Sequence, residues 1–179
     1  QFLQDNVNQR DDDYGGAPQN RIRFLREAIE AVTSEWSAGR VGVRLSPLGQ
    51  FNDMGDSAPE TVFGEAYDFV SSKNLAYLHV VEKFPGSELS GTESNMMEKL
   101  RKRYSGFYIA NGDYDAETGA GAIQSGHADA IAYGRPFIAN PDLPARFRLD
   151  AELNIPDQNT FYGGGTEGYT DYSDRKSVV

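Results

Sequence analysis

The sequence contains no cysteine and only two histidines among its 179 residues. Without cysteine the chain can form neither a disulfide framework nor a thiolate metal site, and this is compatible with the cytoplasm, where we expect the protein to reside. The two histidines, His79 and His127, belong to no recognised metal-ligand motif with acidic or histidine residues. We therefore predict that both are structural and that the chain binds no metal.

Long apolar runs and clustered positive charge are also missing. No apolar segment approaches the ~18 residues of a membrane span. Lysine and arginine total 17 against 27 aspartates and glutamates, which gives a net charge of −10. Binding the phosphates of nucleic acids or anionic lipids requires clustered basic side chains, and the short basic run at 99–103 fits a solvated helix face. We expect neither nucleic acid nor membrane as a partner.

Helical and strand-like segments alternate from residue 20 onward. The strand-like segments are 41–47, 75–81, 107–110 and 128–133, and the helical ones are 20–36, 59–70, 93–104, 115–126 and 141–148. Because no hairpin signal separates the strands, this α/β alternation predicts parallel βαβ units. The strands are apolar on both sides, which predicts that both faces of the sheet are covered. Four such units fit either an open doubly wound sheet or half of a (β/α)8 barrel.

A positive charge interrupts the first strand. Arg44 lies within Val-Gly-Val-Arg-Leu-Ser-Pro at 41–47, where an unpaired buried charge would cost several kcal/mol. The guanidinium therefore needs an anionic or electron-rich partner. The plainer interpretation is a buried ion pair with a neighbouring carboxylate.

Two glycine-containing loops follow the third and fourth strands. They read Ala-Asn-Gly-Asp-Tyr at 110–114 and Ala-Tyr-Gly-Arg at 132–135. In a barrel, the loops after the last two strands often bind phosphate, because glycine lets backbone N–H groups approach the oxygens and arginine adds a bidentate donor. A glycine after a strand often only makes the turn. Two such loops, one strand–helix unit apart, leave both interpretations open: plain turns, or a phosphate site built from Gly112, Asp113, Gly134 and Arg135.

The chain closes with Thr-Phe-Tyr-Gly-Gly-Gly-Thr-Glu-Gly-Tyr-Thr-Asp-Tyr at 160–172. A glycine triplet is costly to order, so this segment either stays mobile or wraps closely around something. Together with 41–47 and with Ala-Tyr-Gly-Arg-Pro-Phe-Ile-Ala-Asn-Pro-Asp-Leu at 132–143, it resembles the second half of the Old Yellow Enzyme family, the flavin-dependent ene-reductases. The likeness covers nearly the whole chain.

This resemblance implies a fold and a division of the chain. Residues 1–179 would form one segment, the C-terminal half of a TIM (β/α)8 barrel with its strands five to eight and their helices. Within that segment, 150–179 would be a tail that folds back over the active-site face. The tyrosines Tyr169 and Tyr172 match a family signature and are expected to be packing residues.

The resemblance also implies roles for individual residues. Arg44 would lie near the N1–C2=O edge of the flavin and stabilise the negative charge of its reduced form. The loops at 112–113 and 134–135 would bind the phosphate of FMN. Tyr162 would lie beside flavin and substrate, and the plain alternative is that it belongs to a flexible tail. Asn52 would border the substrate pocket, and the plain alternative is that it belongs to a surface loop. At 113 the family has a small or amide residue, so we expect the aspartate carboxylate to point away from the phosphate.

The implied activity is that of an FMN-dependent oxidoreductase. It would take hydride from NADPH (or NADH) and pass it from flavin N5 to an activated alkene such as an enone, maleimide or nitroalkene. In the family, the groups that grip the carbonyl and donate the proton precede the segment matching residues 1–3. We therefore expect no catalytic residue in this chain, and inactivity until the N-terminal half of the barrel complements it, from the same or a separate chain.

Position 1 is glutamine, with no initiator methionine, and we expect a fragment, a processed chain or part of a longer one. Two other functions stay open. One is binding of FMN phosphate without catalysis, by a half-barrel fragment, and the other is a different phosphate-binding TIM-barrel enzyme.

Overall fold

The computed structural model describes residues 1–174. These residues divide into two compact units, the first covering Gln1–Ile131 and the second beginning at Ala132. The first unit holds the sheet and five helices, and the second holds two short helices and the C-terminal segment. None of the described helices has both the length and the apolar character needed to cross a bilayer.

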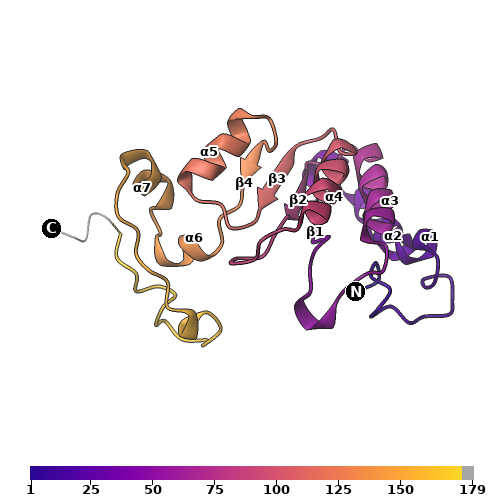
Figure 1. Ribbon diagram of the computed structural model, residues 1–179, viewed down its shortest axis with the longest axis horizontal. Coiled ribbons are helices and arrows are strands. Elements are labelled where there is room, and N and C mark those ends of the chain that lie inside the picture. The colour runs from indigo at the N-terminus through magenta and orange to yellow at the C-terminus, as the bar shows by residue number, and fades with distance from the viewer. Residues whose placement is uncertain (175–179) are drawn as a thin grey trace. The chain divides into compact units, whose positions relative to one another are not determined.

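A four-stranded parallel sheet with the order β1–β2–β3–β4 forms the centre of the first unit (Figure 1). Its strands are β1 (Gly42–Leu45), β2 (Tyr77–Val81), β3 (Tyr108–Asn111) and β4 (Ala130–Ile131). Each strand pairs in parallel with the next along the chain, so the connections are strand–helix–strand crossovers, as predicted. A doubly wound sheet reverses its strand order at a switch point. No reversal occurs among these four strands of the described chain, which favours the barrel.

Local sequence signals set the helices of this unit. They are α1 (Pro18–Arg21), α2 (Arg23–Glu35), α3 (Pro59–Ser72), α4 (Gly91–Lys102) and α5 (Ala116–Gln124), with 3-10 turns η1 (Ala38–Arg40) and η2 (Phe51–Asp53). The predicted helix at 20–36 is two helices that meet at Ile22. Capping boxes start α4 at Ser90 and α5 at Asp115, each satisfying backbone donors that the first turn leaves unpaired.

Only one face of the sheet is packed. The buried strand residues, which share the core with apolar side chains of α3 and α4, are Leu45, Leu78, Val80, Tyr108 and Ala110. Of the alternate positions, Arg44 and Tyr77 are exposed and His79 is half-buried, while Val81 at the end of β2 is buried but lies outside the core cluster. The prediction that both faces are covered is therefore wrong for the described chain. Strand–helix–strand crossovers are right-handed, and each new strand is added on the same side of the last one, so the helices all lie on the same face of the sheet. No described segment of the chain covers the opposite face.

The second unit contains α6 (Arg135–Ala139), α7 (Leu143–Leu149) and the 3-10 turn η3 (Gln158–Thr160). Buried polar side chains hold its C-terminal segment. The amide of Asn140 accepts from the backbone N–H of Asn154 at 2.7 Å, and Arg146 Nη2 donates to the carbonyl of Ser173 at 3.0 Å. Of the predicted tail at 150–179, residues 175–179 lie outside the described residues.

Candidate functional site

The carboxyl ends of the strands place the loops that carry the predicted site. In a parallel sheet these ends share one edge, which is where ligands of α/β proteins bind. The loop after β1 contains Asn52, the loop after β2 begins at Glu82, and the loop after β3 contains Gly112 and Asp113. This edge of the first unit is therefore the candidate site.

Arg44 lies on the uncovered face of the sheet. It is exposed, and it is in register with His79 on the neighbouring strand. Within residues 1–174 its guanidinium has no ion-pair partner, so the expected buried pair with a carboxylate is wrong. The reason is the missing cover over this face, which leaves the charge in solvent. Burial, and next the charge of Arg44, lower the pKa of His79, which keeps this histidine neutral.

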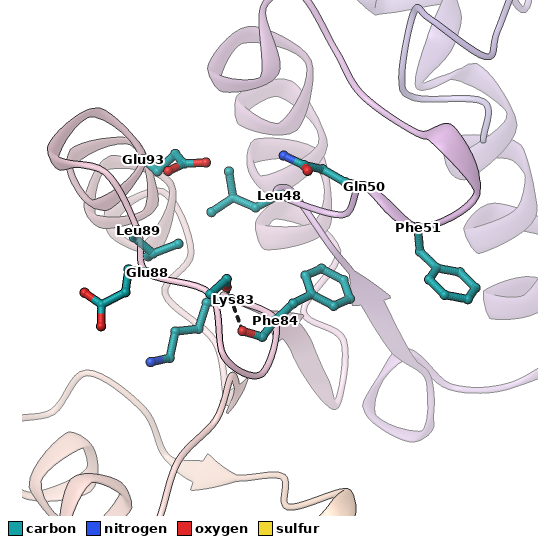
Figure 2. A pocket seen from close by; sticks show the side chains of 9 residues that line it. Leu48, Gln50, Phe51, Lys83, Phe84, Glu88, Leu89 and Glu93 are labelled. Atoms are coloured by element: carbon teal, nitrogen blue, oxygen red, sulfur yellow. Dashed lines mark hydrogen bonds between the residues drawn. The ribbon is translucent and has the colours of Figure 1, made fainter. Parts of the chain in front are cut away.

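A cavity of about 350 Å³ lies between the loops after β1 and β2. Figure 2 shows its wall, with Leu48, Gln50 and Phe51 from the first loop and Lys83, Phe84, Glu88 and Leu89 from the second. Asn52 is exposed in η2, next to the cavity-lining Phe51, and its backbone is left-handed with φ 57°. An asparagine tolerates this conformation better than most residues. The cavity is large enough for a small organic substrate.

The loop after β3 rests on the loop after β2. Gly112 is buried, and a Cβ added there would lie 3.0 Å from the backbone nitrogen of Lys83, so any other residue would force the two loops apart by a few tenths of an ångström. The Asp113 carboxylate accepts a hydrogen bond from the backbone N–H of Gly86 at 3.2 Å. In the described residues, the N–H groups of Gly112 and Asp113 donate no hydrogen bond to another backbone group. Two backbone donors thus remain available at this loop.

A buried carboxylate that sequence reasoning missed lies behind these loops. Glu82 is only 8% exposed. Its Oε1 accepts from the Tyr108 hydroxyl at 2.9 Å and from His127 Nε2 at 2.7 Å, and its Oε2 accepts from the Tyr114 hydroxyl at 2.6 Å. Glu82 and His127 are 45 residues apart, so no local pattern predicts the pair. His127 thus has an acidic partner that its sequence neighbours do not supply.

The protonation of this cluster follows from its contacts. Burial alone would raise the pKa of Glu82, but the hydrogen bonds from His127, Tyr114 and Tyr108 outweigh it and lower that pKa. The hydrogen bond to Glu82 raises the pKa of His127 against the effect of burial. Burial raises the pKa of Tyr108 further above its ordinary value. The cluster is therefore an anionic carboxylate held by donors. No three His, Asp or Glu side chains of residues 1–174 gather as a metal site would require.

The remaining predicted residues belong to the second unit. Gly134 precedes α6 and Arg135 is its first residue; both are exposed, and a Cβ at Gly134 would meet nothing within 4 Å. Tyr162 is 98% exposed. Tyr169 is 77% exposed, so its predicted packing role is wrong for the described chain. Tyr172 is half-buried, and its hydroxyl accepts from a backbone N–H at 2.8 Å.

Comparison with known proteins shows what the chain is similar to. Residues 1–154 match the NADH:flavin oxidoreductase / NADH oxidase family. Over 183 aligned residues the sequence is 40% identical to 12-oxophytodienoate reductase 2 of Arabidopsis thaliana. This alignment covers 100% of this chain and 48% of that protein.

Solved structures agree with the sequence match. Morphinone reductase superposes with a TM-score of 0.89 at 42% identity, over 97% of this chain and 46% of its own. The structure of its complex with tetrahydroNAD superposes with a TM-score of 0.85 at 43% identity, again over 97% of this chain and 46% of its own. The chain thus spans about half the length of these relatives, and its sheet and helices form part of a TIM barrel, which confirms the predicted fold. The chain belongs to the NADH:flavin oxidoreductase / NADH oxidase family, as a member of its Old Yellow Enzyme group.

Proposed function

We propose that this chain is the half of an FMN-dependent NAD(P)H oxidoreductase that holds the flavin phosphate, and that the complete enzyme reduces activated alkenes. Enones, maleimides and nitroalkenes are the substrate class. The family match over residues 1–154 carries this proposal. In support, one relative is named a 12-oxophytodienoate reductase and another a morphinone reductase, solved with tetrahydroNAD. Bound FMN supplies the chemistry of hydride transfer, from a reduced nicotinamide to its N5 and on to the alkene.

The donors of the candidate site fit this cofactor. In the first unit, the N–H groups of Gly112 and Asp113 suit a phosphate, which backbone donors bind well. In the second unit, Gly134 and Arg135 at the exposed start of α6 offer donors of the kind that a phosphate takes. Arg44 presents a positive charge on the uncovered sheet face, where a flavin ring would gain negative charge on reduction. The Asp113 carboxylate, engaged with a backbone N–H, does not need to face the phosphate.

Substrate contacts fall to the loops and the tail. The cavity beside Phe51 accepts the alkene, and Asn52 borders it. Tyr162, in the second unit, is assigned to substrate contact in the complete enzyme. The carbonyl clamp and the proton donor are supplied outside this chain. No residue of this chain is assigned a catalytic role.

The uncovered face and the outer edges of β1 and β4 indicate the partner. Unpaired strand edges and a bare sheet face are a liability unless another segment covers them. The N-terminal half of the barrel, on the same or a separate chain, would pair with both edges and cover the face. Alone, the chain would be inactive.

The test uses the complete protein, in which this chain is joined to or paired with the other half. We expect a bound-flavin spectrum and NADPH or NADH oxidation that depends on 2-cyclohexenone. Bound flavin without turnover would indicate an FMN-binding protein that is not an enzyme, and colourless protein would refute the proposal.

A charge variant tests the role of Arg44. Arg44→Gln should make the flavin reduction potential more negative by roughly 30–60 mV, because about 30 mV corresponds to 1.4 kcal/mol for two electrons. The matched control is Arg40→Gln, since Arg40 is exposed and lies over the Trp36 ring at 5.1 Å. The control should leave the potential unchanged. Equal potentials for Arg44→Gln and the parent would remove Arg44 from the cofactor site.

A further inference from the structure

Glu82 is a buried charge without a direct task in the proposed chemistry. A negative side chain cannot attract a phosphate, and its oxygens are occupied by the donors of Tyr108, His127 and Tyr114. Burying a carboxylate is costly unless each of its hydrogen bonds is made. Any effect of Glu82 on ligand binding must therefore act through one of its three hydrogen-bond donors.

One of these groups is part of the candidate phosphate loop. Tyr108 lies within β3 and His127 lies between α5 and β4, so both belong to the framework. Tyr114 instead directly follows Asp113 and is two residues from Gly112. Its hydroxyl donates to Glu82 Oε2 at 2.6 Å. The carboxylate thus connects the loop to two framework residues through one side chain.

Further contacts join the same two segments. The backbone N–H of Glu82 donates to the carbonyl of Asn111 at 2.7 Å, and that of Gly86 donates to the Asp113 carboxylate at 3.2 Å. A Cβ on Gly112 would lie 3.0 Å from the Lys83 backbone nitrogen. Backbone, side-chain and packing contacts therefore all fix residues 111–114 against residues 82–86.

We infer that Glu82 is a positioning residue for the phosphate loop, acting through the Tyr114 hydroxyl to hold the N–H groups of Gly112 and Asp113 in place for an FMN phosphate. This inference rests on the proposed function. Backbone donors bind a phosphate well only when held within about 0.5 Å of the productive geometry. Loss of the Tyr114 contact should therefore weaken recognition of the phosphate and spare recognition of the flavin ring.

The experiment compares FMN with riboflavin, which lacks the phosphate. The complete apoprotein is titrated with each ligand by flavin fluorescence, and the ratio of the two affinities is measured. Tyr114→Phe should lower the preference for FMN about tenfold, because a charge-assisted hydrogen bond to the loop is lost. Tyr108→Phe is the matched control. It removes the same kind of hydroxyl from the same carboxylate but from a strand, and it should leave the ratio within about twofold of the parent.

A general loss of structure would weaken both ligands equally, so the ratio separates positioning from folding. Glu82→Gln, which retains shape, should shift the ratio in the same direction as Tyr114→Phe and provides a second variant if the first does not fold. An unchanged ratio in both variants, or an equal fall in Tyr108→Phe, would overturn the inference. If the parent protein bound riboflavin as tightly as FMN, the phosphate site itself, and with it the proposed function, would fail.

Discussion

Replacing Glu82 with glutamine should remove a pH-dependent part of the stability of the protein. The substitution keeps the size of the side chain but loses its charge and one of its two acceptor oxygens. Glu82 now accepts three hydrogen bonds, at 2.9, 2.7 and 2.6 Å. Hydrogen bonds to a charged group contribute about 1.5–3 kcal/mol each, and glutamine can keep some of them. We expect the free energy of unfolding to fall by roughly 2–4 kcal/mol at pH 6.

The sign of the pH dependence follows from the two pKa shifts. The pKa of folded Glu82 is lowered, since its hydrogen bonds outweigh burial. Its contribution is therefore present above the unfolded pKa of about 4.3 and is lost as the pH falls through the folded value. The hydrogen bond to Glu82 raises the pKa of folded His127. That contribution is present below about pH 6.5 and is lost as the pH rises through the folded value. Both contributions are complete only between about pH 4.3 and 6.5.

Urea unfolding of the complete protein from pH 4 to 8 measures this difference. The gap between the parent and Glu82→Gln should be largest near pH 5–6 and shrink on both sides. The control is Glu60→Gln, which breaks an exposed bridge to Lys99 at 3.0 Å and should cost under about 1 kcal/mol. A Glu82→Gln protein as stable as the parent at pH 6, or a gap that stays constant from pH 4 to 8, would refute this account of the cluster.

Three further substitutions concern the loop after β3, helix α5 and the N-terminal segment. Gly112→Ala would place a Cβ 3.0 Å from the backbone nitrogen of Lys83, so the loop must shift; fluorescence titration should show FMN affinity reduced about tenfold. In contrast, Gly121→Ala, with nothing within 4 Å, should keep the affinity and add about 0.5–1 kcal/mol of stability. Arg21→Met would remove the ion-pair partner of the Asp56 carboxylate and leave it only backbone N–H donors, at a site where the two side chains are 4% and 0% exposed. Urea unfolding should show a loss of about 3–5 kcal/mol, and a loss below about 1 kcal/mol would contradict a desolvated pair.

Features that depend on neighbours along the chain could be read from the sequence. The parallel strand–helix alternation, the start of α3 at Pro59 and the cap of α5 at Asp115 are all as predicted. These signals are local, because a cap or an apolar period involves residues within one or two turns. The two glycine loops were located in the same way, since a loop that follows a parallel strand must lie at its carboxyl end. The roles assigned to Gly112 and Gly134 stay predictions.

Tertiary structure decided what depends on partners far away in the chain. The sequence pattern placed Arg44 in an apolar strand, but the exposure of its side chain depends on which face of the sheet the helices cover. The bare sheet face also exposes Tyr77. Sequence patterns did not reveal α6, because its five residues are too few to show a helical period. The contact between Glu82 and His127 joins residues 45 positions apart. The sequence by itself determined the order and type of most elements, while burial, charge pairing and the support of the phosphate loop were set by packing, since these energies exist only between groups that folding brings together.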